Sequence, residues 1–109
     1  MATLTPKRLF TSAPGAAANT TVYTATGVTA LFSSLNICCT NAAGDTVRVF
    51  IVTSGQSAGT GYAAIYDMTI PYGNSYAGNL AITLNAGDFI VVYAAGGFCT
   101  FIGSGGEYA

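Results

Sequence analysis

The sequence predicts an all-β protein with a jelly-roll-like fold, an antiparallel β-sandwich of about eight short strands. Clusters of Gly, Asn, Asp and Pro recur about every 8 to 12 residues, a spacing typical of all-β sandwiches and barrels. The runs between these clusters are rich in Val, Ile, Thr, Tyr and Phe, which favour strands. No window has a convincing helical pattern, since the alanine run 16–18 is short and follows Pro-Gly.

Composition and flanking turns predict eight strands, at residues 4–10, 20–24, 29–40, 45–53, 63–69, 75–83, 88–94 and 98–103. Residues 1–109 are expected to form a single domain. Within it, residues 1–15 are open to two interpretations, a first strand followed by a loop or an extended arm that reaches a neighbouring subunit. The glycine-rich run 103–106 predicts a flexible terminus.

The alternation of side chains in two of these strands predicts which faces are buried. In strand 29–40, one face is expected to be core, the face that carries Leu31, Ser33, Leu35, Ile37 and Cys39. Strand 45–53 is apolar on both faces, because Phe50 and Val52 lie beside Arg48, opposite Val47 and Val49. Such a strand either lies between two layers or packs its second face on a neighbour.

Charge is scarce in this chain. Hydrophobic residues make up 51% of the sequence and charged residues 6%, against about 25% in ordinary domains. A folded monomer of this size exposes on the order of 5,600 Å², or about 800 Å² per charge. One side of a standard protein interface also covers about 800 Å². The surface must therefore contain uncharged areas as large as a binding face.

The same composition argues against several function classes. Three basic residues are too few to neutralise a useful number of phosphates, so we expect no nucleic-acid partner. No run approaches the length of about 18 apolar residues that a membrane helix requires, so we expect no membrane span. The chain has no histidine, which removes Ser-His-Asp and Cys-His catalysis and the commonest metal ligand.

The carboxylates offer little catalytic chemistry. Asp45 and Asp88 each follow a glycine, which predicts structural roles in turns. Asp67 lies in the apolar run 65–68, where it either pairs with Arg48 across strands or faces solvent at an edge. A glycosidase-like pair of Asp67 with Glu107 is disfavoured because Glu107 lies near the glycine-rich end. We therefore expect a non-enzymatic protein without catalytic residues, cofactor or metal.

The three cysteines are expected to be free structural thiols. An odd number argues against a complete disulfide framework. Cys38 and Cys39 are adjacent, so they point to opposite faces of a strand, one toward the core and one toward the surface. No histidine or adjacent cation is placed to activate these residues or Cys99 as nucleophiles.

Candidate interface residues come from the tyrosines and the few cations. Four tyrosines lie close in sequence to the turn at 71–74, where they either stack on a sugar or a protein partner or cover the edge of the core. Strand 45–53 contributes an arginine and a phenylalanine, and the first strand contributes a Lys-Arg pair that suits an acidic partner surface. The candidates are Lys7, Arg8, Arg48, Phe50, Tyr62, Tyr66, Tyr72 and Tyr76.

Four segments together resemble a family of small β-sandwich virion proteins of tailed phages. They are the opening LTPKRL at 4–9, the strand LNICCTN at 35–41, IYD at 65–67 with the following Ile-Pro, and the turn LNAGDFI at 84–90. Their order and spacing cover nearly the whole chain, although each motif alone is common. The adjacent pair Cys38-Cys39 departs from the single cysteine expected in that strand.

The resemblance implies a virion structural protein, made in the host cytoplasm and located on the capsid surface. It implies a capsid decoration (cement) protein that bridges subunits of the major capsid protein, as a homo-oligomer with a trimer favoured. The alternative is a small tail or fibre module that binds a host-surface glycan or another tail protein. The family pattern is a scaffold, so no functional residue is carried over from it.

Overall fold

The computed structural model describes residues 4–40, 44–71 and 75–108. These residues form eight strands and one short 3-10 helix, η1 (Thr60–Tyr62). The strands are β1 (Leu4–Ser12), β2 (Thr20–Thr24), β3 (Thr29–Cys39), β4 (Asp45–Val52), β5 (Ala63–Ile70), β6 (Ser75–Leu84), β7 (Phe89–Ala94) and β8 (Cys99–Tyr108). The predicted all-β fold is confirmed. Both ends of each of the first seven strands lie within two residues of the predicted positions.

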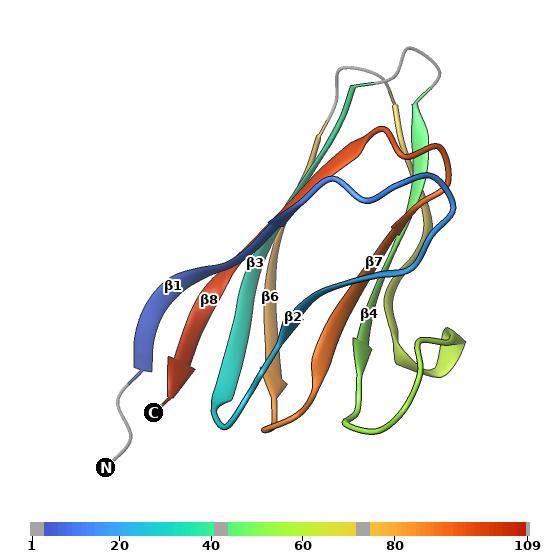
Figure 1. Cartoon of the computed structure of the whole chain (residues 1–109). Helices are drawn as coiled ribbons and strands as arrows, with labels where there is room; N and C mark the ends of the chain where they lie inside the picture. Colours follow the sequence, from blue (N-terminus) through green and yellow to red (C-terminus); the bar gives the residue numbers. More distant parts are fainter. Residues whose placement is uncertain (1–3, 41–43, 72–74, 109) are drawn as a thin grey trace.

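The strands form two four-stranded sheets that pack face to face (Figure 1). One sheet has the order β1-β8-β3-β6 and the other β2-β7-β4-β5, and all neighbouring strands are antiparallel. The first strand pairs with the last, the second with the seventh, the third with the sixth and the fourth with the fifth. This nesting is the connectivity of a jelly roll, a long hairpin that is folded into a sandwich.

The main core fills the space between the two sheets. Phe10 of β1 and Phe32 of β3 pack edge to face with their ring centroids 5.7 Å apart. The largest fully buried side chains come from β3, β8, β7, β4 and the end of β6, and include Phe32, Phe101, Leu35, Ile37, Leu84 and Ile90. Burial of aromatic and branched side chains from both sheets holds the layers together.

The predicted core face of β3 is only half right. Leu35, Ile37 and Cys39 are buried as expected, but upstream of them the buried residues are Ala30 and Phe32. The pairing of β3 with both β6 and β8 shifts in register between Phe32 and Ser34. A bulge adds a residue and moves the alternation by one position, so it exchanges the two faces of the strand.

The prediction of a flexible glycine-rich terminus is wrong. Residues 103–106 belong to β8, which lies between β1 and β3 inside its sheet (Figure 1). Glycine is required there by close approach, because a Cβ atom on Gly105 would lie 1.7 Å from the carbonyl oxygen of Leu31. At Gly103 a Cβ atom would lie 2.3 Å from the ring of Phe10. Glycines here make room for neighbouring strands and side chains.

Candidate functional site

Asp45 has a structural role, as predicted, but it holds a turn other than its own. The side chain is 8% exposed at the start of β4, and its carboxylate accepts backbone N–H groups from Thr46 (2.8 Å), Gly96 (2.8 Å) and Phe98 (3.0 Å). Burial alone would raise the pKa of Asp45, but these hydrogen bonds and one from the Cys99 thiol outweigh it and lower the pKa. The carboxylate thus fixes the β7–β8 turn to the start of β4.

Asp88 closes the turn before β7, as its Gly-Asp sequence predicts. Its carboxylate accepts the backbone N–H of Asn85 (3.0 Å) within that turn. It also accepts the backbone N–H of Ser54 (3.0 Å) in the loop that follows β4. Both carboxylate oxygens are therefore occupied by backbone donors of the fold.

Glu107 joins three strands from both sheets. Its carboxylate accepts a hydrogen bond from Lys7 Nζ of β1 (3.2 Å) and a short hydrogen bond from the Tyr23 hydroxyl of β2. Both hydrogen bonds lower the pKa of Glu107, and the one from Tyr23 has the larger effect. The pKa of Tyr23 is raised, mainly by burial and secondly by its hydrogen bond to Glu107 and the negative charge there.

The structure does not bring Glu107 and Asp67 together as a glycosidase-like pair. Glu107 reaches β2, whereas Asp67 lies on β5, and β7 and β4 separate those two strands in their sheet. Each carboxylate also has a cationic partner of its own, Lys7 and Arg48 respectively. Among the described residues, no group of three or more His, Cys, Asp or Glu side chains is arranged to hold a metal ion.

The cysteines divide as the sequence predicts, with Cys38 exposed and Cys39 buried. Cys39 lies opposite Cys99 in the β3–β8 pairing, and Cys99 is also buried. Burial, with contributions from Cys39 and Asp45, raises the pKa of the Cys99 thiol to about 12. The thiolate is the nucleophilic form, so the raised pKa argues against Cys99 as a nucleophile near neutral pH.

A cluster of polar and aromatic side chains lies on the outer face of the sheet β2-β7-β4-β5. We call it the Arg48 cluster, and it consists of Arg48, Tyr66, Asp67 and Tyr93. The guanidinium carbon lies 4.4 Å from the centroid of the Tyr66 ring and 4.6 Å from that of Tyr93. Arg48 Nε donates to Asp67 Oδ1 at 2.6 Å, which confirms that Asp67 pairs with Arg48 across strands. Arg48 is therefore held by two rings and a carboxylate.

A bulge in β5 builds this cluster. Val47 pairs with Met68 and Val49 pairs with Ile65, so two residues of β5 lie opposite Arg48 alone. These two residues are Tyr66 and Asp67, and Asp67 has the left-handed backbone conformation with φ +54°. The extra residue allows both neighbours to reach Arg48, which regular alternation would prevent.

A small second core covers part of the same face. Phe50, Val52 and Val91 are buried there, and partly buried residues from the β4–β5 connection pack against them, including Ala58 and Tyr62. Of the two alternatives for β4, the structure therefore supports a strand between two layers, the main core and this second core, both formed by its own chain. Phe50 is only 3% exposed, so it is not available to a partner and is withdrawn as an interface candidate.

The predicted tyrosines do not form a single group. Tyr66 is 47% exposed in the Arg48 cluster, and Tyr62 belongs to the second core. Tyr76 packs against the main core and is apart from Tyr66, because β6 and β5 belong to different sheets. Tyr72 lies outside the described residues. The sequence analysis missed Tyr93, although it shares its face of strand 88–94 with the apolar Val91.

The two basic residues of β1 differ in their surroundings. Lys7 is tied to Glu107, as described above. Arg8 is exposed and lies opposite Ser104 of β8, and it forms no ion pair within the described part of the chain. Arg8 is therefore the residue of this pair that could contact an acidic partner without giving up an ion pair in the described chain.

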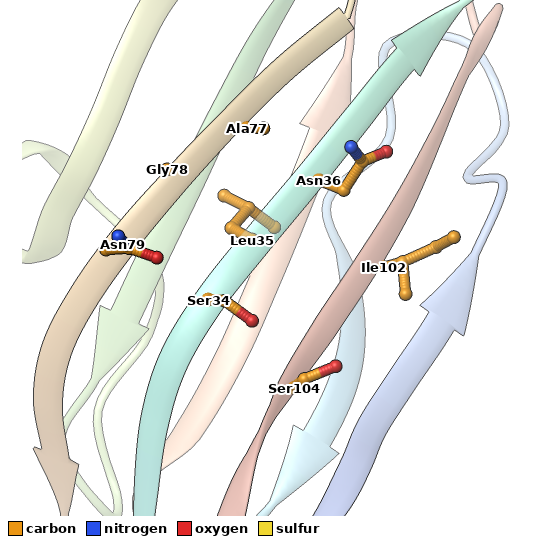
Figure 2. A pocket seen from close by; sticks show the side chains of 8 residues that line it. All are labelled: Ser34, Leu35, Asn36, Ala77, Gly78, Asn79, Ile102 and Ser104. Atoms are coloured by element: carbon orange, nitrogen blue, oxygen red, sulfur yellow. The ribbon is translucent and has the colours of Figure 1, made fainter.

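An uncharged groove of about 440 Å³ lies on the outer face of the other sheet, across β6, β3 and β8 (Figure 2). Small and neutral side chains line it, namely Ser34, Leu35, Asn36, Ala77, Gly78, Asn79, Ile102 and Ser104. β3 and β6 carry no charged residue along their whole length. Sequence alternation places the exposed side chains of these strands on one face, but no motif in the sequence indicates the groove.

Comparisons of the chain with known protein families, with curated proteins and with solved structures found no match. In the part of the chain that the structure describes, no helix is long and apolar enough to cross a membrane. The two candidate sites of the sandwich are the Arg48 cluster on one outer face and the uncharged groove on the other.

Proposed function

We propose that this protein is a non-enzymatic structural component of a phage virion, and specifically a capsid decoration (cement) protein. The supporting observation is that most of its few charged side chains already have a partner within the same chain. Six of the seven formal charges contact an ion-pair partner or backbone N–H groups within the described structure, namely Lys7, Asp45, Arg48, Asp67, Asp88 and Glu107. Such a surface can lie against another protein without burying many unpaired charges, which would be costly.

The proposed mechanism is adhesion. Copies of the protein bind the outer surface of the shell and span neighbouring major capsid protein subunits, with about 800 Å² buried on each side of a standard contact. A protein that binds the assembled shell, but not its separate subunits, stabilises the assembled state by mass action. Tyr and Arg are enriched among residues that dominate interface energies, so Tyr66 and Arg48 are the proposed anchors. A homotrimer is the favoured assembly, on the resemblance described above.

Copy number in purified virions tests this proposal. Quantitative mass spectrometry of the phage that encodes the chain would compare this protein with the major capsid protein. A ratio near one copy per capsid subunit supports decoration of the shell. Absence from purified virions would overturn the proposal of a structural virion component.

A small tail or fibre module is the second candidate, and the exposed Tyr66 ring favours it. At 47% exposure beside Arg48, this ring can stack on a sugar or pack against another tail protein. A handful of copies per particle in the same measurement would support this candidate over decoration of the capsid.

A further inference from the structure

The groove is built from two rows of side chains that cross three neighbouring strands. Asn79, Ser34 and Ser104 lie opposite one another in the pairing of β6, β3 and β8 and form the first row. The second row, one step along the strands, consists of Ala77, Asn36 and Ile102. Figure 2 shows the two amides and the two hydroxyls among the side chains that line the groove.

Four of these side chains have free hydrogen-bonding capacity. Within the described residues, the side chains of Ser34, Asn36, Asn79 and Ser104 make no intramolecular hydrogen bond. A hydroxyl or an amide both donates and accepts, which matches a ligand that carries many hydroxyl groups. The strands fix the backbone positions of these residues, so the spacing between the four groups is set before a ligand binds.

The absence of charge in the groove limits the ligand further. None of its eight lining residues is charged. The nearest charge in the first row is Arg8 of β1, which lies opposite Ser104 beyond the end of the groove. A buried or partly buried ionic group on the ligand would therefore lack a partner over most of the groove, at a cost in binding. A neutral ligand has no such cost.

The lining also favours a sugar over a protein. Protein interfaces usually depend on aromatic or large apolar anchors in a pocket. Here the only large apolar residues are Ile102 and Leu35, and Leu35 is 2% exposed. The residue types that anchor proteins lie on the opposite sheet, in the Arg48 cluster.

We infer that this groove binds a neutral oligosaccharide, with the side-chain amides of Asn36 and Asn79 as its main hydrogen-bonding groups. The sugar chain lies across β6, β3 and β8, and one of its apolar faces contacts Ile102. This site is separate from the Arg48 cluster, and its occupancy does not depend on where the protein is located in a particle. If the proposed virion function is wrong, the groove can still bind a sugar. If the groove binds no sugar, the proposed virion function is unaffected.

Nuclear magnetic resonance titration of the ¹⁵N-labelled full chain tests the inference. The probes are two neutral oligosaccharides, maltohexaose and cellohexaose, and one acidic oligosaccharide, hexagalacturonate. Saturable shifts of the amide signals of residues 34–36, 77–79 and 102–104 are expected with at least one neutral probe. Combined Asn36→Ala and Asn79→Ala should weaken that binding about tenfold or more, because two hydrogen bonds are lost.

Two variants serve as controls, since both should bind the neutral probe as the parent does. Gln56→Ala removes an exposed amide from the loop after β4, away from the groove. Arg8→Gln removes the nearest charge, which a neutral sugar does not need. A loss of neutral binding in either control would contradict the assignment.

Four other results would overturn the inference. The first is the absence of saturable shifts with both neutral probes. The second is binding of hexagalacturonate at least as tight as that of the neutral probes. The third is a set of shifts centred on Tyr66 and Tyr93. The fourth is a change of the groove signals on dilution without sugar, which would mean that a second copy of the chain covers the groove.

Discussion

Arg48 and Asp67 form an ion pair on the outer face of the sandwich because β5 carries one extra residue opposite Arg48. The extra residue also brings Tyr66 against the guanidinium, while Tyr93 approaches from β7 on the other side. A local irregularity of the edge strand thus creates the most interface-like group of side chains on this sheet. Bulges commonly redirect side chains in this way at sheet edges.

The backbone of Asp67 gives the first prediction. Its left-handed conformation, φ +54°, is unfavourable for most residues with a Cβ atom and costs about 1 kcal/mol. Asp67→Ala and Asp67→Gly both remove the ion pair, but only glycine adopts this conformation freely. We expect Asp67→Gly to be the more stable of the two by about 1 kcal/mol in urea unfolding. Equal stabilities would contradict the bulge.

The glycines of β8 give the second prediction. Gly105→Ala places a Cβ atom against the carbonyl oxygen of Leu31, a backbone atom that cannot rotate away. We expect a loss of about 3 kcal/mol or more in the free energy of unfolding, or a chain that does not fold. Gly59→Ala is the matched control, because nothing lies within 4 Å of its added Cβ and its φ of −170° suits any residue. A stable Gly105→Ala protein would mean that β8 does not lie inside the sheet.

Acid sensitivity gives the third prediction. The folded state lowers the pKa of Asp45, so the unfolded chain binds more protons at acidic pH. The stability that comes from the charged carboxylate is present above the ordinary pKa of about 4 and is lost as the pH falls through the lower, folded value. Glu107, whose pKa is also lowered, acts in the same direction.

Asp45→Asn isolates the contribution of Asp45 to this pH dependence. The variant loses the charge that accepts three backbone N–H groups, so we expect about 2 kcal/mol or more of destabilisation near neutral pH. We also expect its free energy of unfolding to change less than that of the parent between neutral pH and strong acid. Urea unfolding across this range measures both effects, and parallel curves for parent and variant would refute the assignment.

The proposed anchor role of Tyr66 gives the fourth prediction. Tyr66→Ala should weaken binding to capsids stripped of this protein about tenfold or more, because exposed tyrosines can dominate an interface. Phe98→Ala is the matched control, since Phe98 is 46% exposed and Tyr66 47%, but Phe98 lies on the β7–β8 turn. Co-sedimentation with capsids measures both, and equal losses would remove the Arg48 cluster as the contact site.

The free cation on β1 gives the fifth prediction. If Arg8 contacts an acidic capsid surface, Arg8→Glu should weaken capsid binding without lowering the melting temperature of the isolated protein, because Arg8 has no ion-pair partner in the described chain. Lys7→Glu is the contrasting variant. It places two carboxylates together at Glu107 and should lower the melting temperature. Unchanged capsid binding by Arg8→Glu would remove this proposal.

Much of the fold was predictable because turn residues and β-branched runs are local signals. Residues Thr20–Thr24 were predicted with the boundaries that β2 has. The bulges at Ser33 and Asp67 were not predictable, since each depends on how many residues the partner strand places opposite. The end of β8 was missed because glycines usually weaken a strand, and their value here lies in neighbours that only the folded structure reveals.

The interface candidates show the same limit. Arg48 and Tyr66 were predicted as interface residues, and the pairing of Asp67 with Arg48 was one of two alternatives. Tyr93, the second ring against Arg48, was not predicted, because it comes from a strand distant in sequence. Tyr76 was grouped with Tyr66 by proximity in the chain, although the connection between β5 and β6 crosses from one sheet to the other. Proximity in sequence indicates proximity in space only when no change of layer intervenes.

The pairing of β1 with β8 places the two ends of the described chain so close together that a short turn could join them. Leu4 lies directly opposite Tyr108, and antiparallel partners are about 5 Å apart, a distance that a hairpin turn spans. If the ends were joined there, the path of the chain would become a closed ring of four nested strand pairs. New ends could then be opened in the exposed loop after β4, so a circular permutant would keep every pairing of this jelly roll while its order of synthesis changed.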